Sequence, residues 1–266
     1  MDRSEALVRA GEILWGAWRQ GTVILSLPDD CRPLTRAEGY RVQAAIEARS
    51  AGPLFGWKIA ATSPAGQRHI NVDGPIAGRL LRERVYPSGS RLSLARNRMA
   101  VAEPEFAFRM GRDIQPRRRP YSAGEVMTAT ASMHPAIEVP DSRFADFTAA
   151  GEAQIIADNA CAHDFVLGDP APQAWRTINL SQHRVQGQVC GTTRSYSRDG
   201  NGAHVLGNPL DALVWLVNEL SSLGVTLHRD HVVTTGACTV PLEVIAGDQV
   251  VADFGPLGAV SVRFSE

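Results

Sequence analysis

The chain has 266 residues, of which 44% are hydrophobic and 21% are charged, and its formal net charge is −1. This composition excludes a mostly disordered chain, and the near-neutral charge argues against binding to a nucleic-acid backbone or an anionic membrane. The length fits one large domain, or a core with a small extra lobe.

Several functional classes lack their usual motifs. The cysteines show no CxxC spacing for zinc, and no GxSxG, GxGxxG or P-loop sequence occurs. No stretch approaches the roughly 18 apolar residues of a membrane span, and no signal-like segment precedes the first helical pattern. We therefore expect a cytoplasmic protein that binds neither nucleic acid nor membrane.

The N-terminal part, residues 1–54, is predicted to be mainly helical. Apolar residues recur at three- and four-residue spacing over residues 6–18, which is typical of one face of a helix. A second helix is predicted to begin at the capping-box pattern of Thr35 and Glu38 and to run toward Arg49.

The remaining residues, 55–266, show a different pattern, in which glycine and proline separate short apolar runs. These runs predict strands at 56–60, 100–108, 136–139, 232–235, 249–254 and 259–264. Helices are predicted near 123–133 and at 209–223, and a hairpin turn at Gly247-Asp248. The expected fold is α+β: a β-rich mixed catalytic domain continuous with the helical N-terminal part.

Two glutamates stand close together in the predicted strand 100–108. Side chains alternate along a strand, so Glu103 and Glu105 share one face while Phe106 and Phe108 share the other. Two adjacent carboxylates need solvent, a basic partner or a hard cation. For this pair alone, a solvated strand face is the simpler interpretation.

Glu138 supplies a third carboxylate in an apolar strand. It lies in the sequence Ile137-Glu138-Val139, where a charge is costly unless it is paired or bound to a metal. Three carboxylates form an oxygen-only site that suits Mg²⁺ or Mn²⁺. The alternative is a salt bridge from Glu138 to Arg143 or Lys58.

Lys58 is the single lysine of the chain, and it stands in an apolar predicted strand. A lysine can exchange protons at a shifted pKa, which arginine cannot. Lys58 is therefore a candidate for proton transfer, or a structural counter-ion for one of the glutamates.

An ordered set of motifs resembles the 2-keto-4-pentenoate hydratase and 4-oxalocrotonate decarboxylase family of the fumarylacetoacetate hydrolase superfamily. The motifs are GWKIAATS at 56–63, EPE at 103–105, PAIEVPDSR at 135–143, DNA at 158–160, TTG at 234–236 and ADFG at 252–255. They follow one another in the family's order over nearly the whole chain.

The resemblance implies a fold of the fumarylacetoacetate hydrolase C-terminal type, a Mg²⁺ or Mn²⁺ ion and a homo-oligomer. It places metal ligands at Glu103, Glu105 and Glu138, and catalytic residues at Lys58 and Asp73. It places substrate contacts at Ser63, Ser142, Thr235 and Gly236. Departures near Gly74 and Cys161 fall in the substrate half of the site, so they affect substrate identity more than metal binding.

The predicted function is metal-dependent hydration of a 2-hydroxy-2,4-dienoate to a 4-hydroxy-2-oxo acid, in the degradation of aromatic compounds. The nearest alternative is decarboxylation of a 2-oxo-3-enedioate, for which Arg68, Arg79 or Arg82 could bind the second carboxylate. Carbon–carbon hydrolysis is less favoured because no histidine occupies a matching position. A catalytically silent partner subunit is the non-enzyme alternative.

Overall fold

The structure, a computed structural model, describes residues 2–266. Its helices are α1 (Arg3–Gln20), α2 (Arg36–Glu47), α3 (Pro64–Ile70), α4 (Ala123–Ala129), α5 (Glu152–Ala157) and α6 (Pro209–Ser222). Its strands are β1 (Gly56–Ala60), β2 (Ile76–Leu80), β3 (Val85–Pro87), β4 (Arg91–Ser93), β5 (Val101–Met110), β6 (Thr130–Val139), β7 (Asp164–Leu167), β8 (Arg184–Cys190), β9 (Ser195–Asn201), β10 (Val232–Ala237), β11 (Leu242–Glu243), β12 (Gln249–Asp253) and β13 (Ala259–Ser265).

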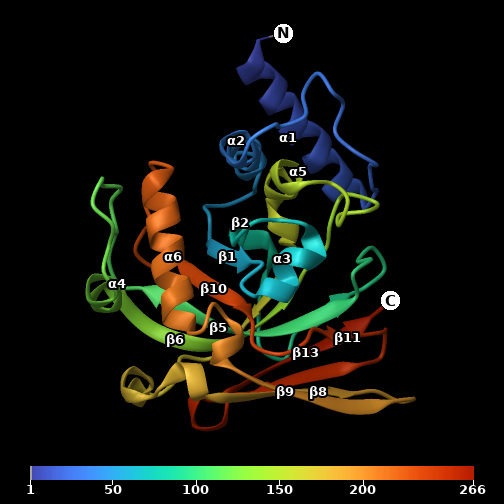
Figure 1. The fold of residues 1–266 in the computed structure, drawn as a ribbon. Helices are drawn as coiled ribbons and strands as arrows, with labels where there is room; N and C mark the ends of the chain where they lie inside the picture. The colour runs from blue at the N-terminus through green and yellow to red at the C-terminus, as the bar shows by residue number, and fades with distance from the viewer. Residues whose placement is uncertain (1) are drawn as a thin grey trace.

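The strands form two sheets. The larger has eight strands in the order β2-β1-β10-β5-β6-β7-β3, with β11 also paired to β5, and the smaller has the order β4-β13-β12-β8-β9. Figure 1 shows β8, β9 and β13 beneath the curved larger sheet, with α1, α2 and α5 above it. This arrangement confirms the predicted α+β, β-rich mixed fold.

The two long central strands, β5 and β6, carry side chains into the space between the sheets. Phe106 and Phe108 on β5 and Ile137 on β6 have no exposed surface. The Phe106 ring meets Phe254 edge-to-face with 5.0 Å between centroids, so the two sheets share this core. Phe106 and Phe108 therefore fix which face of β5 is left for its glutamates.

The N-terminal helices form where the sequence predicts them, although one cap differs. The Thr35 side chain accepts a hydrogen bond from the Glu38 amide, as an N-cap does. The Glu38 carboxylate, however, binds the Arg3 guanidinium at 2.6 and 2.7 Å and the Leu34 amide, so the capping box is not reciprocal. An ion pair between α1 and the start of α2 replaces it.

Three local differences separate the observed elements from the predicted ones. The helix predicted near 123–133 ends at Ala129, and Thr130 begins β6 by pairing with Met110. Gly247-Asp248 is a turn but closes no hairpin, because β11 pairs with β5 whereas β12 pairs with β8 and β13. The β8–β9 hairpin was not predicted.

Along residues 2–266, no helix combines the length and the apolar character needed to cross a membrane.

His163 joins the N-terminal helix to the larger sheet. Its imidazole stacks on the Trp18 ring of α1 with 5.7 Å between centroids. Burial, reinforced by Arg84 and Arg143, holds the pKa of His163 well below its usual value of 6.5. The folded protein therefore keeps this ring neutral, whereas the unfolded chain takes up a proton as the pH falls below about 6.5. The stability that His163 contributes is complete above that pH and is lost below it.

We expect His163→Gln to reduce the loss of unfolding free energy between pH 7 and pH 5 by about 2 kcal/mol relative to the wild type. Denaturant unfolding of both proteins at both pH values measures the difference in slope. His69→Gln, at an exposed position, is the matched control. Equal pH slopes for wild type and His163→Gln would show that the buried ring is not the source.

Candidate active site

The register between β5 and β6 brings the three predicted glutamates together. Glu103 lies directly opposite Glu138, and Glu105 lies opposite Ala136. Opposed residues of an antiparallel pair share a face, so all three carboxylates project from the same side. Each glutamate offers an oxygen, and these oxygens lie within 4.8 Å of one another. Glu105 and Glu138 are buried and Glu103 is half-buried.

Lys58 reaches the same cluster from β1. This strand runs parallel to β10, with Lys58 paired to Thr234. The Lys58 Nζ atom lies 3.0 Å from Glu138 Oε1 and donates a hydrogen bond of 2.9 Å to the carbonyl oxygen of Ala160. Both charged side chains are almost fully buried, with 4% and 1% exposure. The salt bridge considered for Glu138 is therefore made by Lys58.

The carboxylate oxygens of the cluster are only partly used by the protein. Glu105 Oε2 accepts hydrogen bonds from the Thr234 hydroxyl and, at 2.8 Å, from the Gly236 amide. Glu105 Oε1 and both Glu138 oxygens are buried without a hydrogen bond of acceptable geometry among residues 2–266. Unsatisfied buried carboxylate oxygens are costly, and hard divalent cations take such ligands. The donor set therefore fits a hard divalent cation.

The pKa values of the cluster reflect the close approach of three buried carboxylates. Burial and the neighbouring Glu138 raise the pKa of Glu103 to about 7. Burial, followed by Glu138 and Glu103, raises the pKa of Glu105 well above its usual range. Burial would lower the pKa of Lys58, but the three glutamates outweigh it, so its pKa is raised and its ammonium keeps its proton.

An unusual turn presents the Ala160 carbonyl to Lys58. Asn159, Ala160 and Cys161 have φ angles of 57°, 52° and 60°, in the left-handed region that non-glycine residues rarely occupy. The Asn159 amide group holds the turn against β2: its Oδ1 accepts from Arg79 N at 2.6 Å, and its Nδ2 donates to Arg79 O at 2.9 Å. Gly78 is required beside it, because a Cβ there would lie 2.3 Å from the Asn159 carbonyl oxygen.

A buried ion pair between Asp158 and Arg143 stabilises this turn. The Asp158 carboxylate binds the Arg143 guanidinium, accepts from the Arg143 amide at 3.0 Å and accepts from the Ser142 hydroxyl at 2.6 Å. Arg143 also donates to the carbonyl oxygens of Asp158 and Ala162, which flank the left-handed residues. The pair therefore ties the end of β6 to the segment that contacts Lys58.

We expect Asp158→Asn to lower the free energy of unfolding by about 3–5 kcal/mol, because the buried Arg143 guanidinium loses its compensating charge. Urea denaturation at pH 7.5 measures the change. Asp169→Asn is the matched control, since Asp169 is exposed and makes no hydrogen bond or ion pair among residues 2–266; it should stay within about 0.5 kcal/mol of the wild type. A similar small change for Asp158→Asn would mean that the pair does not stabilise the fold.

The other residues predicted for the site differ in their contacts. Thr235 donates to the Phe106 carbonyl at 3.0 Å. Gly236, at φ 102°, packs against Thr62, the neighbour of Ser63. Ser63 caps α3 by accepting from the Gly66 amide. Asp73 lies on the exposed loop between α3 and β2, and no hydrogen bond or ion pair among residues 2–266 joins it to the glutamates.

Sequence patterns alone assign no role to three residues that the structure brings to this site. Thr234 holds Glu105, Asn159 holds the left-handed turn, and Asp158 pairs with Arg143. The motif DNA at 158–160 was a usable signal for the last two. Their partners are distant in sequence, so the contacts themselves could not be predicted.

Comparison with known proteins identifies the family to which the chain is related. No protein-family model matches the chain. The 2-keto-4-pentenoate hydratase of Burkholderia vietnamiensis is 32% identical over 257 residues, covering 94% of this chain and 94% of that protein. The 2-keto-4-pentenoate hydratase of Paraburkholderia phymatum is 33% identical over 225 residues, covering 83% and 82%. The structure of 4-oxalocrotonate decarboxylase from Pseudomonas putida G7, complexed with magnesium and adipate, matches with a TM-score of 0.86 at 26% identity, covering 99% and 98%.

These similarities extend over nearly the full length of each protein, and they agree with the ordered motifs and with the fold. The relatives are named as hydratases and a decarboxylase, so the chain is an enzyme of the lyase class. The chain belongs to the 2-keto-4-pentenoate hydratase family.

Proposed function

We propose that this enzyme adds water to a 2-hydroxy-2,4-dienoate to give a 4-hydroxy-2-oxo acid, in the degradation of aromatic compounds. The observation that carries the proposal is the buried cluster of Glu103, Glu105 and Glu138 beside Lys58. The hydratase names of the full-length relatives support the same reaction.

Glu103, Glu105 and Glu138 would hold the metal, for which we propose Mg²⁺ or Mn²⁺. The magnesium in the related decarboxylase structure and the unsatisfied oxygens of Glu105 and Glu138 support this assignment. When bound, such an ion supplies Lewis-acid polarisation of the substrate's 1-carboxylate and 2-oxygen.

Lys58 is proposed as the residue that holds and transfers a proton. Its Nζ keeps a proton because the glutamates raise its pKa, and the Ala160 carbonyl and Glu138 fix its position. A positioned ammonium can protonate a developing carbanion or stabilise negative charge on the 2-oxygen. Asp73 is proposed to orient the attacking water, and its exposed loop leaves its carboxylate free to do so.

The substrate contacts are proposed on three segments. Thr235 and Gly236 are proposed for the carboxylate end of the substrate, which the hydrogen bond from the Gly236 amide to the predicted metal ligand Glu105 supports. Ser63 follows Thr62, which packs against Gly236, and its hydroxyl hydrogen is not used by its cap. Ser142 contributes through its bond to Asp158.

The protein architecture leads to two further parts of the proposal. Residues 1–54 and 55–266 are proposed to form one continuous unit, supported by a single core cluster that contains both Leu14 and Trp57. The enzyme is also proposed to act as a homo-oligomer on its small-molecule 2-oxo or 2-hydroxy acid substrate.

Decarboxylation of a 2-oxo-3-enedioate is the second candidate, favoured by the TM-score of 0.86 with the decarboxylase. It would need a cation for the second substrate carboxylate. Arg79 is committed to Glu47 and Gln43, and Arg82 lies over the Phe55 ring at 4.8 Å. Arg68, which is exposed, is the remaining candidate.

An assay with 2-hydroxypenta-2,4-dienoate and Mg²⁺ separates these functions. Loss of the dienol absorbance with incorporation of ¹⁸O from labelled water is expected for the hydratase. Release of CO₂ from 2-oxo-3-hexenedioate, without hydration of the dienoate, would instead establish the decarboxylase. Inactivity toward both substrates in the presence of Mg²⁺ and of Mn²⁺ would reject the proposal.

A further inference from the structure

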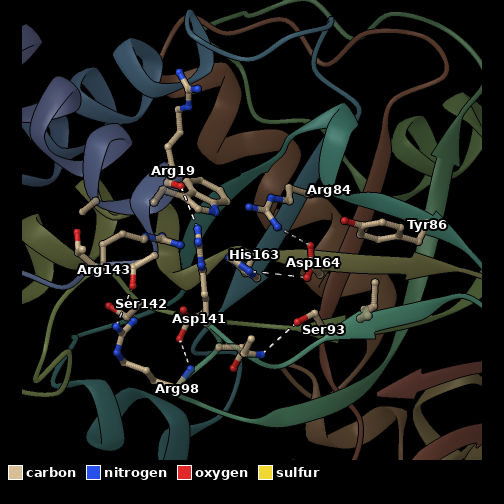
Figure 2. A pocket seen from close by; sticks show the side chains of 18 of the residues that line it. Arg19, Arg84, Tyr86, Ser93, Arg98, Asp141, Ser142, Arg143, His163 and Asp164 are labelled. Atoms are coloured by element: carbon tan, nitrogen blue, oxygen red, sulfur yellow. Dashed lines mark hydrogen bonds and ion pairs between the residues drawn. The ribbon is translucent and has the colours of Figure 1, made fainter. Parts of the chain in front are cut away.

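A cavity of about 340 Å³ is lined by none of the cluster's glutamates, although Ser142, whose hydroxyl binds Asp158, borders it. Its walls come from the end of α1, the segment from Arg84 to Arg98, the residues that follow β6 and the start of β7. Neither Lys58 nor any of the three glutamates lines it. Figure 2 shows Arg84, Asp141, His163 and Asp164 around this space, whereas the Arg19 side chain extends away from it.

The lining of this cavity is strongly cationic. Six arginines line it: Arg19, Arg84, Arg91, Arg96, Arg98 and Arg143. Only two acidic side chains do so, Asp141 and Asp164. A concentration of positive charge in a hollow favours binding of anions.

Part of this positive charge is already used by the protein. Arg143 is paired with Asp158, and Arg84 contacts Asp164 at 3.3 Å. Arg96 and Arg98 donate to carbonyl oxygens at the end of α1, at 3.4 and 3.0 Å.

The guanidinium groups of Arg19 and Arg91 make no hydrogen bond or ion pair with any residue of the described chain. Arg91 is exposed on β4. Of these two, Arg91 therefore leaves an uncommitted cationic side chain in the lining of the cavity, since the Arg19 side chain extends away from it.

Two ring nitrogens in the cavity wall lack a partner, and the indole one requires an acceptor oxygen. Trp18 is 6% exposed, and its indole N–H has no hydrogen-bond partner within residues 2–266. His163, stacked on Trp18, has a buried Nδ1 atom that is also unpartnered. An indole N–H can only donate, so it needs an acceptor oxygen to offset the cost of its burial.

We propose that this cavity binds a small oxyanion, a phosphate or a di-carboxylate, with Arg91 compensating its charge and Trp18 donating to one of its oxygens. The volume matches the lower range of small-molecule sites. Guanidinium groups bind carboxylate and phosphate in two-point geometry, so either source of the anion satisfies the site.

Calorimetric titration of the Mg²⁺-loaded full chain tests the proposal. Inorganic phosphate and succinate serve as separate probes, with NaCl at matched ionic strength as the blank. Saturable binding of at least one probe is expected. The probe that binds more tightly shows whether the cavity prefers a phosphate or a di-carboxylate. No saturable binding of either probe up to about 10 mM would overturn the proposal.

Substitutions in the cavity wall test whether the probe binds there. Arg91→Gln should weaken the affinity by about tenfold or more, since it removes one charge-assisted contact. Trp18→Phe keeps an aromatic ring but loses the N–H, and should weaken binding as well. Arg118→Gln, at an exposed arginine outside the cavity, should leave the affinity unchanged.

Lys58→Met distinguishes this cavity from the carboxylate cluster. It should bind the probe as the wild type does, because Lys58 does not line the cavity. Binding that is lost in Lys58→Met and kept in Arg91→Gln would place the anion at the cluster and overturn the proposal.

Discussion

Glu105→Gln is expected to lower kcat by at least about 10³-fold, because a neutral amide cannot replace a charged ligand of a divalent cation. The folded metal-free protein should tolerate the change. Burial and two neighbouring carboxylates raise the pKa of Glu105 well above its usual range, so its protonated form already resembles glutamine. We therefore expect the unfolding free energy without metal to change by less than about 1 kcal/mol.

The decisive measurement is thermal denaturation with and without Mg²⁺, alongside kcat. A ligand that binds only the folded state raises the midpoint of unfolding, so the wild type should gain stability from Mg²⁺ and Glu105→Gln should gain little. Glu243→Gln, at a glutamate with 70% exposure, is the matched control and should behave as the wild type. Full metal-dependent activity in Glu105→Gln would make the ligand assignment wrong.

Lys58→Met is expected to lower kcat by at least about 10³-fold, because it removes the proton-holding cation that contacts Glu138. Metal binding should persist or become tighter, because a competing positive charge has been removed from the cluster. The variant leaves Glu138 without its counter-ion, at a cost of about 3–5 kcal/mol without metal. Activity should therefore be measured at saturating Mg²⁺, with Mg²⁺ affinity determined separately by titration calorimetry.

Lys58→Arg separates the two roles considered for this residue. The guanidinium keeps the positive charge but does not release a proton near neutral pH. Activity in Lys58→Arg close to that of the wild type would mean that charge alone is needed. Loss of activity in both variants, with Mg²⁺ affinity retained, is the result expected for proton transfer.

Much of the fold was predictable because local patterns agree with the tertiary structure. The period-2 alternation around Phe106 and Phe108 predicted a strand with its glutamates on one face. The stripe of apolar residues in 209–223 predicted α6, which has Asn208 as its N-cap. The β8–β9 hairpin escaped prediction because β9, SYSRDGN, carries polar residues and glycine instead of β-branched ones.

The amino-acid sequence was enough to identify the chemical groups of the site, which are three carboxylates in apolar strands and one lysine that is not needed for solubility. It was enough because a charge among apolar residues must find a partner. Only the tertiary structure decided which partner each group has. Strand register places Glu103 opposite Glu138, and the pairing of β1 with β10 brings Lys58 to Glu138.

The left-handed turn at Asn159–Cys161 and the arginine-lined cavity could not be predicted from local sequence either. Local preference disfavours positive φ at three successive non-glycine residues, and the conformation persists because Arg79, Arg143 and Asp158 hold it from distant parts of the chain. The cavity likewise draws its arginines from separate segments, and in the sequence they are scattered among many other arginines. Local patterns record which residues are costly to bury, whereas long-range packing determines where those residues meet.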